Sequence, residues 1–243
     1  MPEYTITNGT KTVKFQAMSH IGTKKFYDNI INNITEHKNN GGVYFYEGVK
    51  PGTEENLEKF NQAIGIKFDE ELYKNFSKLY GVVNQDNRAF EGLVNDLDFN
   101  IDLNMDEIIA LYEEKINNKE DPTDVYKNKL PLDANKIILE TLASLNDKQL
   151  RILVYINQAI LNFIIGNDTT QDFLTNNFAN TDLFDVILDE RNIVLSDAII
   201  SSEYNNIYIT YGLLHFDGVL EILKQADSKW QVISTTNLYP IKN

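Results

Sequence analysis

Alternating apolar and polar residues at the start of the chain predict a β-hairpin. Residues 4–7 and 12–18 both alternate in this way, and Asn8-Gly9 between them supplies the positive φ angles of a tight turn. A helical pattern follows over residues 24–34, and residues 43–47 form an apolar run that ends in a carboxylate. The order strand, helix, buried strand predicts a crossover between two parallel strands.

The middle of the chain has helical periodicity with start and stop signals. Asn104 and Glu107 form a capping pair, and Gly65 and Gly81 end two of the apolar patterns. The helices expected in this region cover residues 54–64, 69–80, 104–116, 133–144, 147–165 and 181–201. Strands return at residues 207–211 and 230–234. Because both ends of the chain are β and the centre is α, we expect the first and last strands to share one sheet.

These elements predict an α/β fold with a mixed sheet and a helical middle region. We expect a single domain over residues 1–243 with a helical insertion at about 104–180, and a polar connection at residues 121–129 as its boundary. Residues 152–165 are the most apolar stretch, but they are too few to span a bilayer. The apolar face of residues 147–165, which includes Ile160, is therefore expected to be buried in the core or against a partner subunit.

Composition narrows the classes of function. With 243 residues, of which 42% are hydrophobic, the chain can bury a substantial core. The net charge of −14 argues against nucleic acid or an anionic membrane as a partner, and it favours a neutral or cationic substrate. Because the chain has no cysteine, thiolate nucleophiles and cysteine-ligated zinc are excluded. The first residues do not resemble a secretory signal, so the sequence predicts a cytoplasmic protein.

Two of the three histidines occupy the same local position. His20 ends the extended run 13–20, and His215 ends the run 207–215; each is followed by a short turn and a helix. Side chains at the carboxyl ends of strands lie where open α/β sheets bind their ligands. A nearby helix N-terminus also favours the neutral imidazole, which can bind a metal or accept a proton. The alternative is that each histidine only caps or packs a turn.

Glu47 and Arg191 extend this candidate site. Glu47 follows four apolar residues at a strand end, and Arg191 lies on the helix expected at residues 181–201. Two imidazoles and one carboxylate form the ligand set of many open divalent metal sites. Arg191 would then stabilise a developing oxyanion. The alternatives are an ordinary surface ion pair for Arg191 and a solvated edge carboxylate for Glu47.

Four motifs in this order resemble the superfamily of the TraB pheromone-shutdown proteins, the Tiki proteases, the erythromycin esterase-like enzymes and the ChaN haem-binding lipoproteins. The motifs are Met18-Ser19-His20-Ile21-Gly22 with Phe26-Tyr27, Tyr46-Glu47-Gly48-Val49, Glu190-Arg191-Asn192 and Gly212-Leu213-Leu214-His215-Phe216-Asp217-Gly218-Val219. They match the two GxxH motifs, the strand-end glutamate and the helix arginine of that superfamily, with Ala17 in place of the first glycine. The resemblance implies an α/β fold of the erythromycin esterase/ChaN-like type, built from pseudo-duplicated strand-histidine-helix units. It also suggests that residues 79–85, Asp96 and Asp98 contribute to the pocket.

The residues and the resemblance together predict a metal-dependent hydrolase, a peptidase of the TraB/Tiki type. His20, Glu47 and His215 would hold a divalent ion (manganese, cobalt or zinc), its bound water would be the nucleophile, and Arg191 would stabilise the tetrahedral intermediate. A metal-independent, esterase-like hydrolase with a histidine as general base is the alternative. A third reading is a non-catalytic protein that binds a peptide or small ligand. The expected partner is a peptide, protein or small-molecule substrate, and the sequence leaves the oligomeric state open, a homodimer included.

Overall fold

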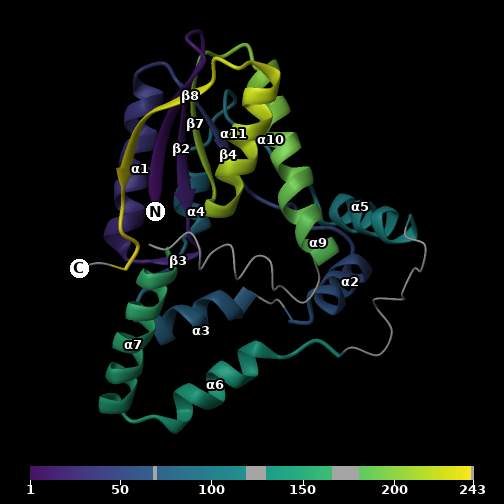
Figure 1. Cartoon of the computed structure of the whole chain (residues 1–243). Coiled ribbons are helices and arrows are strands. Elements are labelled where there is room, and N and C mark those ends of the chain that lie inside the picture. Colours follow the sequence, from purple (N-terminus) through teal and green to yellow (C-terminus); the bar gives the residue numbers. More distant parts are fainter. Residues whose placement is uncertain (68–69, 119–129, 166–180, 242–243) are drawn as a thin grey trace.

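The computed structural model of the chain describes residues 1–67, 70–118, 130–165 and 181–241 (Figure 1). They form an α/β fold around a mixed six-stranded sheet with the strand order β6-β4-β7-β2-β1-β8. The predicted fold class, an α/β protein with a mixed sheet, is confirmed at this level. The boundary expected at residues 121–129 lies outside the described residues.

The sheet is built from both ends of the chain. Strands β1 (Pro2–Thr7) and β2 (Thr12–Met18) form the expected hairpin, with Gly9 at φ 90° in its turn. Strand β7 (Asn206–Gly212) lies between β2 and β4 (Val43–Tyr46) and is parallel to both. The first and last strands thus share one sheet, as predicted. The edge strands are β6 (Phe99–Asn100) and β8 (Gln231–Asn237), and a small second sheet pairs β3 (Ile21–Gly22) with β5 (Val83–Asn84).

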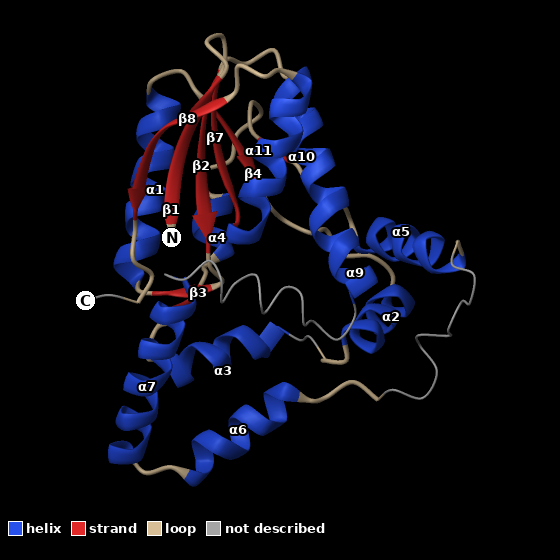
Figure 2. Cartoon of the chain, in the orientation of Figure 1, coloured by secondary structure: helices blue, strands red, loops and turns tan. Residues whose placement is uncertain are grey.

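Two helices cover opposite faces of this sheet (Figure 2). Neighbouring residues of a strand point to opposite faces. Glu3 of β1 accepts a hydrogen bond from Asn33 of α1 (Lys24–Asn39), whereas the adjacent Tyr4 stacks on Phe216 of α11 (Phe216–Ala226) at 3.5 Å between ring centroids. The sheet therefore lies between α1 on one side and α11 on the other. Its buried residues form one continuous hydrophobic core.

The two crossovers that carry these helices start from neighbouring strands and run in opposite directions. Helix α1 leads from β2 to β4, toward the β6 edge, whereas α11 leads from β7 to β8, at the other edge. Such a reversal between adjacent parallel strands opens a crevice outside their carboxyl ends, because the connecting helices leave to opposite faces. The topology therefore favours a ligand site at the carboxyl ends of β2 and β7.

Except for α4 (Asn87–Glu91), whose Phe90 packs in the main core, the helices of the middle region lie beyond the carboxyl ends of the parallel strands (Figure 1). They are α2 (Glu54–Ile64), α3 (Glu70–Tyr80), α5 (Met105–Asn117), α6 (Ala134–Ser144) and α7 (Asp147–Ile165). Helix α5 begins with the predicted capping box of Asn104 and Glu107. A second, smaller core joins α2 and α5 to the helical residues Leu183 and Val186. This core holds α2 and α5 next to the crevice.

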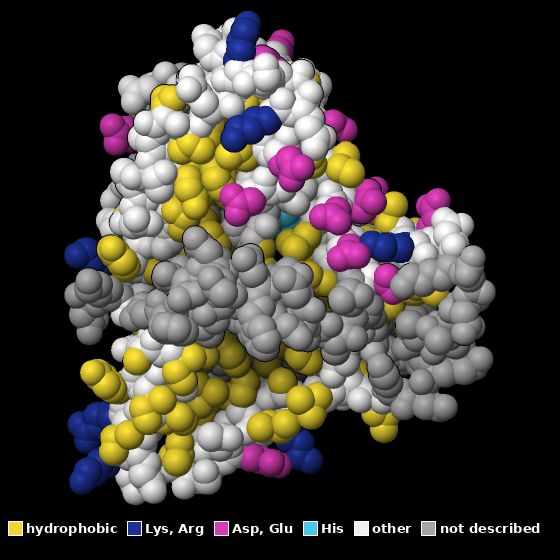
Figure 3. Space-filling view, viewed as in Figure 1, with side chains coloured by type: hydrophobic (Ala, Val, Ile, Leu, Met, Phe, Trp, Pro, Cys, Tyr) yellow, Lys and Arg dark blue, Asp and Glu magenta, His cyan; other side chains and the backbone are white. Residues whose placement is uncertain are grey.

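Ile160 of α7 is 51% exposed, so the expectation that it is buried in the core of the chain is wrong, whereas burial against a partner subunit stays a prediction. Helix α7 packs along α3, where the side-chain amides of Asn157 and Gln158 donate to the carbonyl oxygens of Leu79 and Tyr80. Ile152, Ile156 and Ile160 of α7 are exposed, and apolar side chains gather on the surface over α3, α6 and α7 (Figure 3). Within the described residues, no helix combines the length and hydrophobicity needed to cross a membrane.

Candidate functional site

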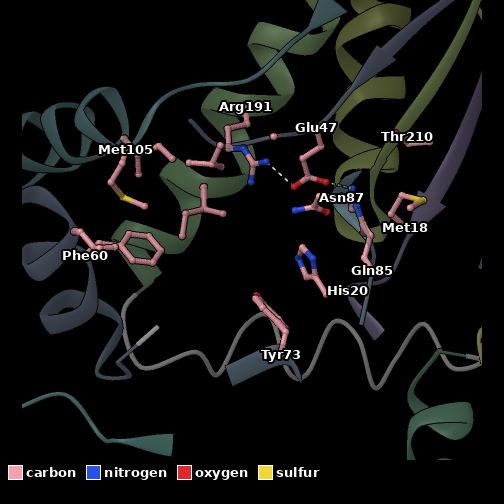
Figure 4. A pocket seen from close by; sticks show the side chains of 16 residues that line it. Met18, His20, Glu47, Phe60, Tyr73, Gln85, Asn87, Met105, Arg191 and Thr210 are labelled. Carbon is pink, nitrogen blue, oxygen red and sulfur yellow. Dashed lines mark hydrogen bonds and ion pairs between the residues drawn. The ribbon is translucent and has the colours of Figure 1, made fainter. Parts of the chain in front are cut away.

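A cavity of about 420 Å³ lies at the carboxyl ends of β2, β4 and β7 (Figure 4). Its walls come from the turns after these strands, from α2, α3 and α5, and from the helical segment that carries Ile187 and Arg191. Of the four predicted site residues, His20, Glu47 and Arg191 line this cavity. The full lining is Met18, His20, Glu47, Gly48, Val49, Leu57, Phe60, Tyr73, Gln85, Asn87, Met105, Ile108, Ile187, Arg191, Thr210 and Gly212.

His20 follows β2 and faces the cavity. Its ring lies 4.7 Å from that of Tyr73, centroid to centroid, and its carbonyl oxygen accepts the backbone N–H of Gln85. The ring is accessible from the cavity, yet the surrounding protein desolvates it, and this burial lowers the pKa of His20 below 6.5. The charge of Glu47 acts in the opposite direction and raises that pKa, whereas Arg191 lowers it. His20 is therefore a neutral imidazole at pH 7.

Glu47 follows β4 and uses both of its carboxylate oxygens. Oε1 accepts from Nη2 of Arg191 at 2.6 Å, and Oε2 accepts the backbone N–H of Gly212 at 2.6 Å. A Cβ at Gly212 would lie at an ordinary contact distance of 3.5 Å from Oε2 of Glu47, but closer, at 3.3 Å, to Cδ2 of His215. Glu47 is thus fixed between the end of β7 and Arg191.

Arg191 is held by a second, fully buried carboxylate. Its Nε and Nη2 donate to the two oxygens of Asp102 at 2.7 and 2.8 Å, a bidentate pair. Burial alone would lower the pKa of Arg191, but the hydrogen bonds that it donates to Asp102 and the charge of Glu47 raise it above its ordinary value. Arg191 is only 5% exposed and stays charged. The bonds that Arg191 donates to Asp102 and Glu47 use its Nε and Nη2 and leave Nη1 outside this pairing.

The backbone changes geometry immediately before Arg191. Segments α9 (Thr181–Asp185), η1 (Val186–Glu190) and α10 (Arg191–Ser201) replace the single helix predicted for residues 181–201. The η1 segment is a π-helical turn, which holds one more residue than an α-helical turn, and such turns occur often at functional sites. Arg191 is the first residue after it, so the wide turn sets the direction in which the guanidinium leaves the helix.

His215 lies next to the site but does not line the cavity. It is 4% exposed, its Nδ1 donates to Oδ1 of Asn192 at 2.8 Å, and Tyr211 meets the ring edge-on. Burial, with a smaller contribution from the charge of Arg191, lowers the pKa of His215 to about 3. The ring is therefore neutral, and the bond to Asn192 ties the start of α11 to α10.

The three expected metal ligands do not form a metal site in this arrangement. Both oxygens of Glu47 are already engaged, and His215 is turned toward Asn192. Across residues 1–67, 70–118, 130–165 and 181–241, no group of three or more histidine, aspartate and glutamate side chains could hold a metal ion. The donor set around His20 therefore does not fit a divalent metal held by His20, Glu47 and His215.

Comparison with protein-family models and with curated proteins gives no match to this chain. The resemblance to the TraB/Tiki superfamily therefore depends on the four motifs alone. The chemistry that the site can perform depends on its own residues and their geometry.

Asp102 belongs to the site but is not among the residues that the sequence predicts for it. It comes two residues after β6, much as Glu47 follows β4. Strand β6 has only two residues, too few for its pattern to be recognised in the sequence. Gln85 lines the cavity, in the segment expected to contribute to it. Asp98 has another role, since it is buried, pairs with Lys38 and accepts the N–H of Tyr44, and Asp96 is exposed.

Proposed function

We propose that the cavity is the active site of a metal-independent hydrolase that cleaves an amide or ester bond, with His20 as the general base. The observation that carries this proposal is a neutral histidine that faces the same cavity as a fixed Glu47–Arg191 pair. A general base must be unprotonated at working pH and reachable by water, and His20 meets both conditions. The donor set of His20, Glu47 and His215 does not support the metal-dependent peptidase that the sequence predicts.

In the proposed reaction, a water oxygen attacks the carbonyl carbon of the substrate while His20 accepts a proton from that water. The resulting imidazolium is stabilised by the charge of Glu47, which raises the pKa of His20. The carbon–heteroatom bond of the tetrahedral intermediate then breaks, and His20 returns the proton to the leaving amine or alcohol. The products are a carboxylic acid and the amine or alcohol, and His20 is neutral again.

Arg191 has two functions in this proposal. Its bonds to Asp102 and Glu47 fix the carboxylate that faces His20, which makes it a positioning residue for Glu47. Its Nη1 supplies a directed N–H donor for the oxyanion of the intermediate. Because two carboxylates already balance its charge, the donor geometry matters more here than the net charge.

We also propose that the two strand-histidine-helix units are related, as in the TraB/Tiki superfamily. Strand β2 with His20 and α1, and strand β7 with His215 and α11, are parallel neighbours in the sheet. In this proposal the two units have diverged in use, since His20 faces the cavity and His215 fastens two helices together.

The test is hydrolysis in the presence of a chelator. Purified protein is incubated with a mixed peptide library, read by mass spectrometry, and with p-nitrophenyl esters, each with EDTA or with manganese, cobalt or zinc. We expect turnover in EDTA that His20→Ala lowers by about 10²–10⁴-fold. His37→Gln is the matched control, because His37 lies on α1 outside the cavity.

Two results would contradict the proposal. Turnover that requires an added metal would restore the metal-dependent peptidase. No turnover of any substrate under any condition would favour a binding protein.

A further inference from the structure

The cavity is divided chemically into two ends (Figure 4). Phe60 and Met105 mark the apolar end, whereas His20 and Glu47 lie with the polar side chains of the other. The apolar end is lined by Leu57 and Phe60 of α2, Met105 and Ile108 of α5, and Ile187 of the π-helical turn. Except for Met18 and Val49, the side chains at the strand ends are polar or absent. An apolar group of a ligand in this cavity would therefore contact α2 and α5.

A second hollow of about 280 Å³ adjoins the polar end. It shares Glu47, Gly48, Val49, Gln85, Asn87 and Thr210 with the first, so the two hollows meet at the proposed reacting centre. From there it continues along Tyr44, Tyr46 and Phe90 to Glu91. The two hollows are thus parts of one cleft, with Glu47 between an apolar end and an end made of aromatic rings and a carboxylate.

The electrostatics of the second hollow disfavour an anion. Glu91 is exposed and forms no ion pair among the described residues, and Lys50 is the one lysine or arginine in the lining of this hollow. Burial raises the pKa of Tyr46, and the negative charges of Asp98 and Glu91 raise it further. The group of Glu47, Asp102 and Arg191 adds one net negative charge. The aromatic lining that Tyr46 contributes and the carboxylates together suit a cationic group or an N–H donor.

We propose that the cleft takes a two-part substrate, in which the cleaved bond joins an apolar group to a cationic or N–H-donating group. The apolar group, an aliphatic chain or a leucine- or phenylalanine-like side chain, lies between α2 and α5. The cationic group lies against Tyr46 and Glu91. This inference depends on the proposed function only in assigning the cleaved bond to the position of His20 and Glu47.

Binding of simple probes to the His20→Ala variant tests this without turnover. The probes are n-butylammonium, n-octylammonium and octanoate, measured by calorimetry in 0.15 M salt to limit general attraction to an acidic protein. Each buried methylene strengthens binding up to about fourfold, so four extra methylenes that are half to fully buried give about 20- to 200-fold. We expect n-octylammonium to bind tighter than n-butylammonium by this factor and tighter than octanoate by at least tenfold.

Variants at each end separate the cleft from general adsorption. Leu57→Gln should reduce the gain from chain length at least fivefold, whereas Leu139→Gln should not, since Leu139 is a similarly exposed leucine on α6 outside the cleft. Glu91→Gln should reduce the preference for the ammonium probe, whereas Glu36→Gln, an exposed change on α1, should not.

The outcomes distinguish this inference from the proposed function. Equal affinity for the two ammonium probes, or equal effects of Leu57→Gln and Leu139→Gln, would overturn the apolar end. Equal affinity for n-octylammonium and octanoate would overturn the cationic end. If the wild type hydrolyses esters but the probes show no preference, only this inference fails. If the preferences appear and no substrate is hydrolysed, the two-part cleft stands and the proposed function fails.

Discussion

Replacing Asp102 with asparagine tests the buried ion pair that holds the site together. Its Oδ1 accepts from Nε of Arg191 at 2.7 Å and from the N–H of Leu103 at 2.9 Å. Its Oδ2 accepts from Nη2 of Arg191 at 2.8 Å and from the N–H of Gly48 at 3.0 Å. Asparagine keeps the shape of the side chain, but in either orientation its NH₂ group faces two N–H donors.

The expected cost follows from the burial of the pair. The side chains of Asp102 and Arg191 are 0% and 6% exposed, so water cannot replace the lost contacts. Breaking a buried ion pair by removing one partner costs about 3–5 kcal/mol, a large share of the stability of most proteins. For a protein of this size, that corresponds to a fall in Tm of roughly 6–20 °C.

The assay is urea unfolding followed by circular dichroism, with thermal melting as a second measure. Asp28→Asn is the control, because Asp28 forms an exposed ion pair with Lys24 and its loss should change the free energy of unfolding by no more than about 1 kcal/mol. A change of less than about 1 kcal/mol for Asp102→Asn would refute the reasoning, since it would mean that the Arg191 charge does not depend on this partner.

The remaining predictions address catalysis, pH and the exposed helix. The kcat/KM of the wild type should stay constant from pH 8 down to about 6.5 and fall only at lower pH, because the pKa of His20 is lowered; a midpoint above pH 7 would exclude His20 as the base. His215 has a folded pKa of about 3 against 6.5 when unfolded, so its contribution to stability is full above pH 6.5 and is lost as pH falls toward 3, by up to about 1.4 kcal/mol per pH unit. Urea titrations from pH 7 to 4 should therefore show a shallower loss for His215→Gln than for the wild type, and parallel losses would contradict the assignment. Arg191→Lys should lower kcat/KM by about a hundredfold or more and also lower Tm, because lysine cannot make the bidentate bond; an unchanged Tm would argue against that bond. Ile160→Ala should cost less than about 1 kcal/mol in urea unfolding, since the side chain is half exposed, and a cost above 2 kcal/mol would indicate a buried position.

The local patterns predict most of the elements of this fold. The hairpin turn at Gly9 and the capping box at Asn104 depend on residues within a few positions of each other, so both can be predicted from the local sequence. The same holds for the placement of His20 and Glu47 at the ends of parallel strands, because a crossover helix between two strands makes them parallel.

The features that the sequence did not reveal depend on distant contacts. Asp102 and Arg191 are 89 residues apart, and nothing in either local pattern shows that one is the partner of the other. The apolar face of α7 predicts burial, but whether a neighbour covers it is decided by elements elsewhere in the chain, and Ile160 is left exposed. For His215, the strand-end position is visible in the sequence, whereas the rotation of the ring toward Asn192 depends on how α10 packs on α11.

The position of β7 between β2 and β4 has a consequence for biosynthesis. During translation, the first 50 residues emerge with both strands that will flank β7, but the strand that joins them is completed only at residue 212. Until then, β2 and β4 each have an unpaired edge, which can attract other nascent chains. The sheet, and with it the pair of Glu47 and Gly212, can close only after residue 212 has left the ribosome. A ribosome that stalls before residue 206 would therefore leave a chain with many of its helices but without the central strand β7, which makes such a product a substrate for chaperones and proteases.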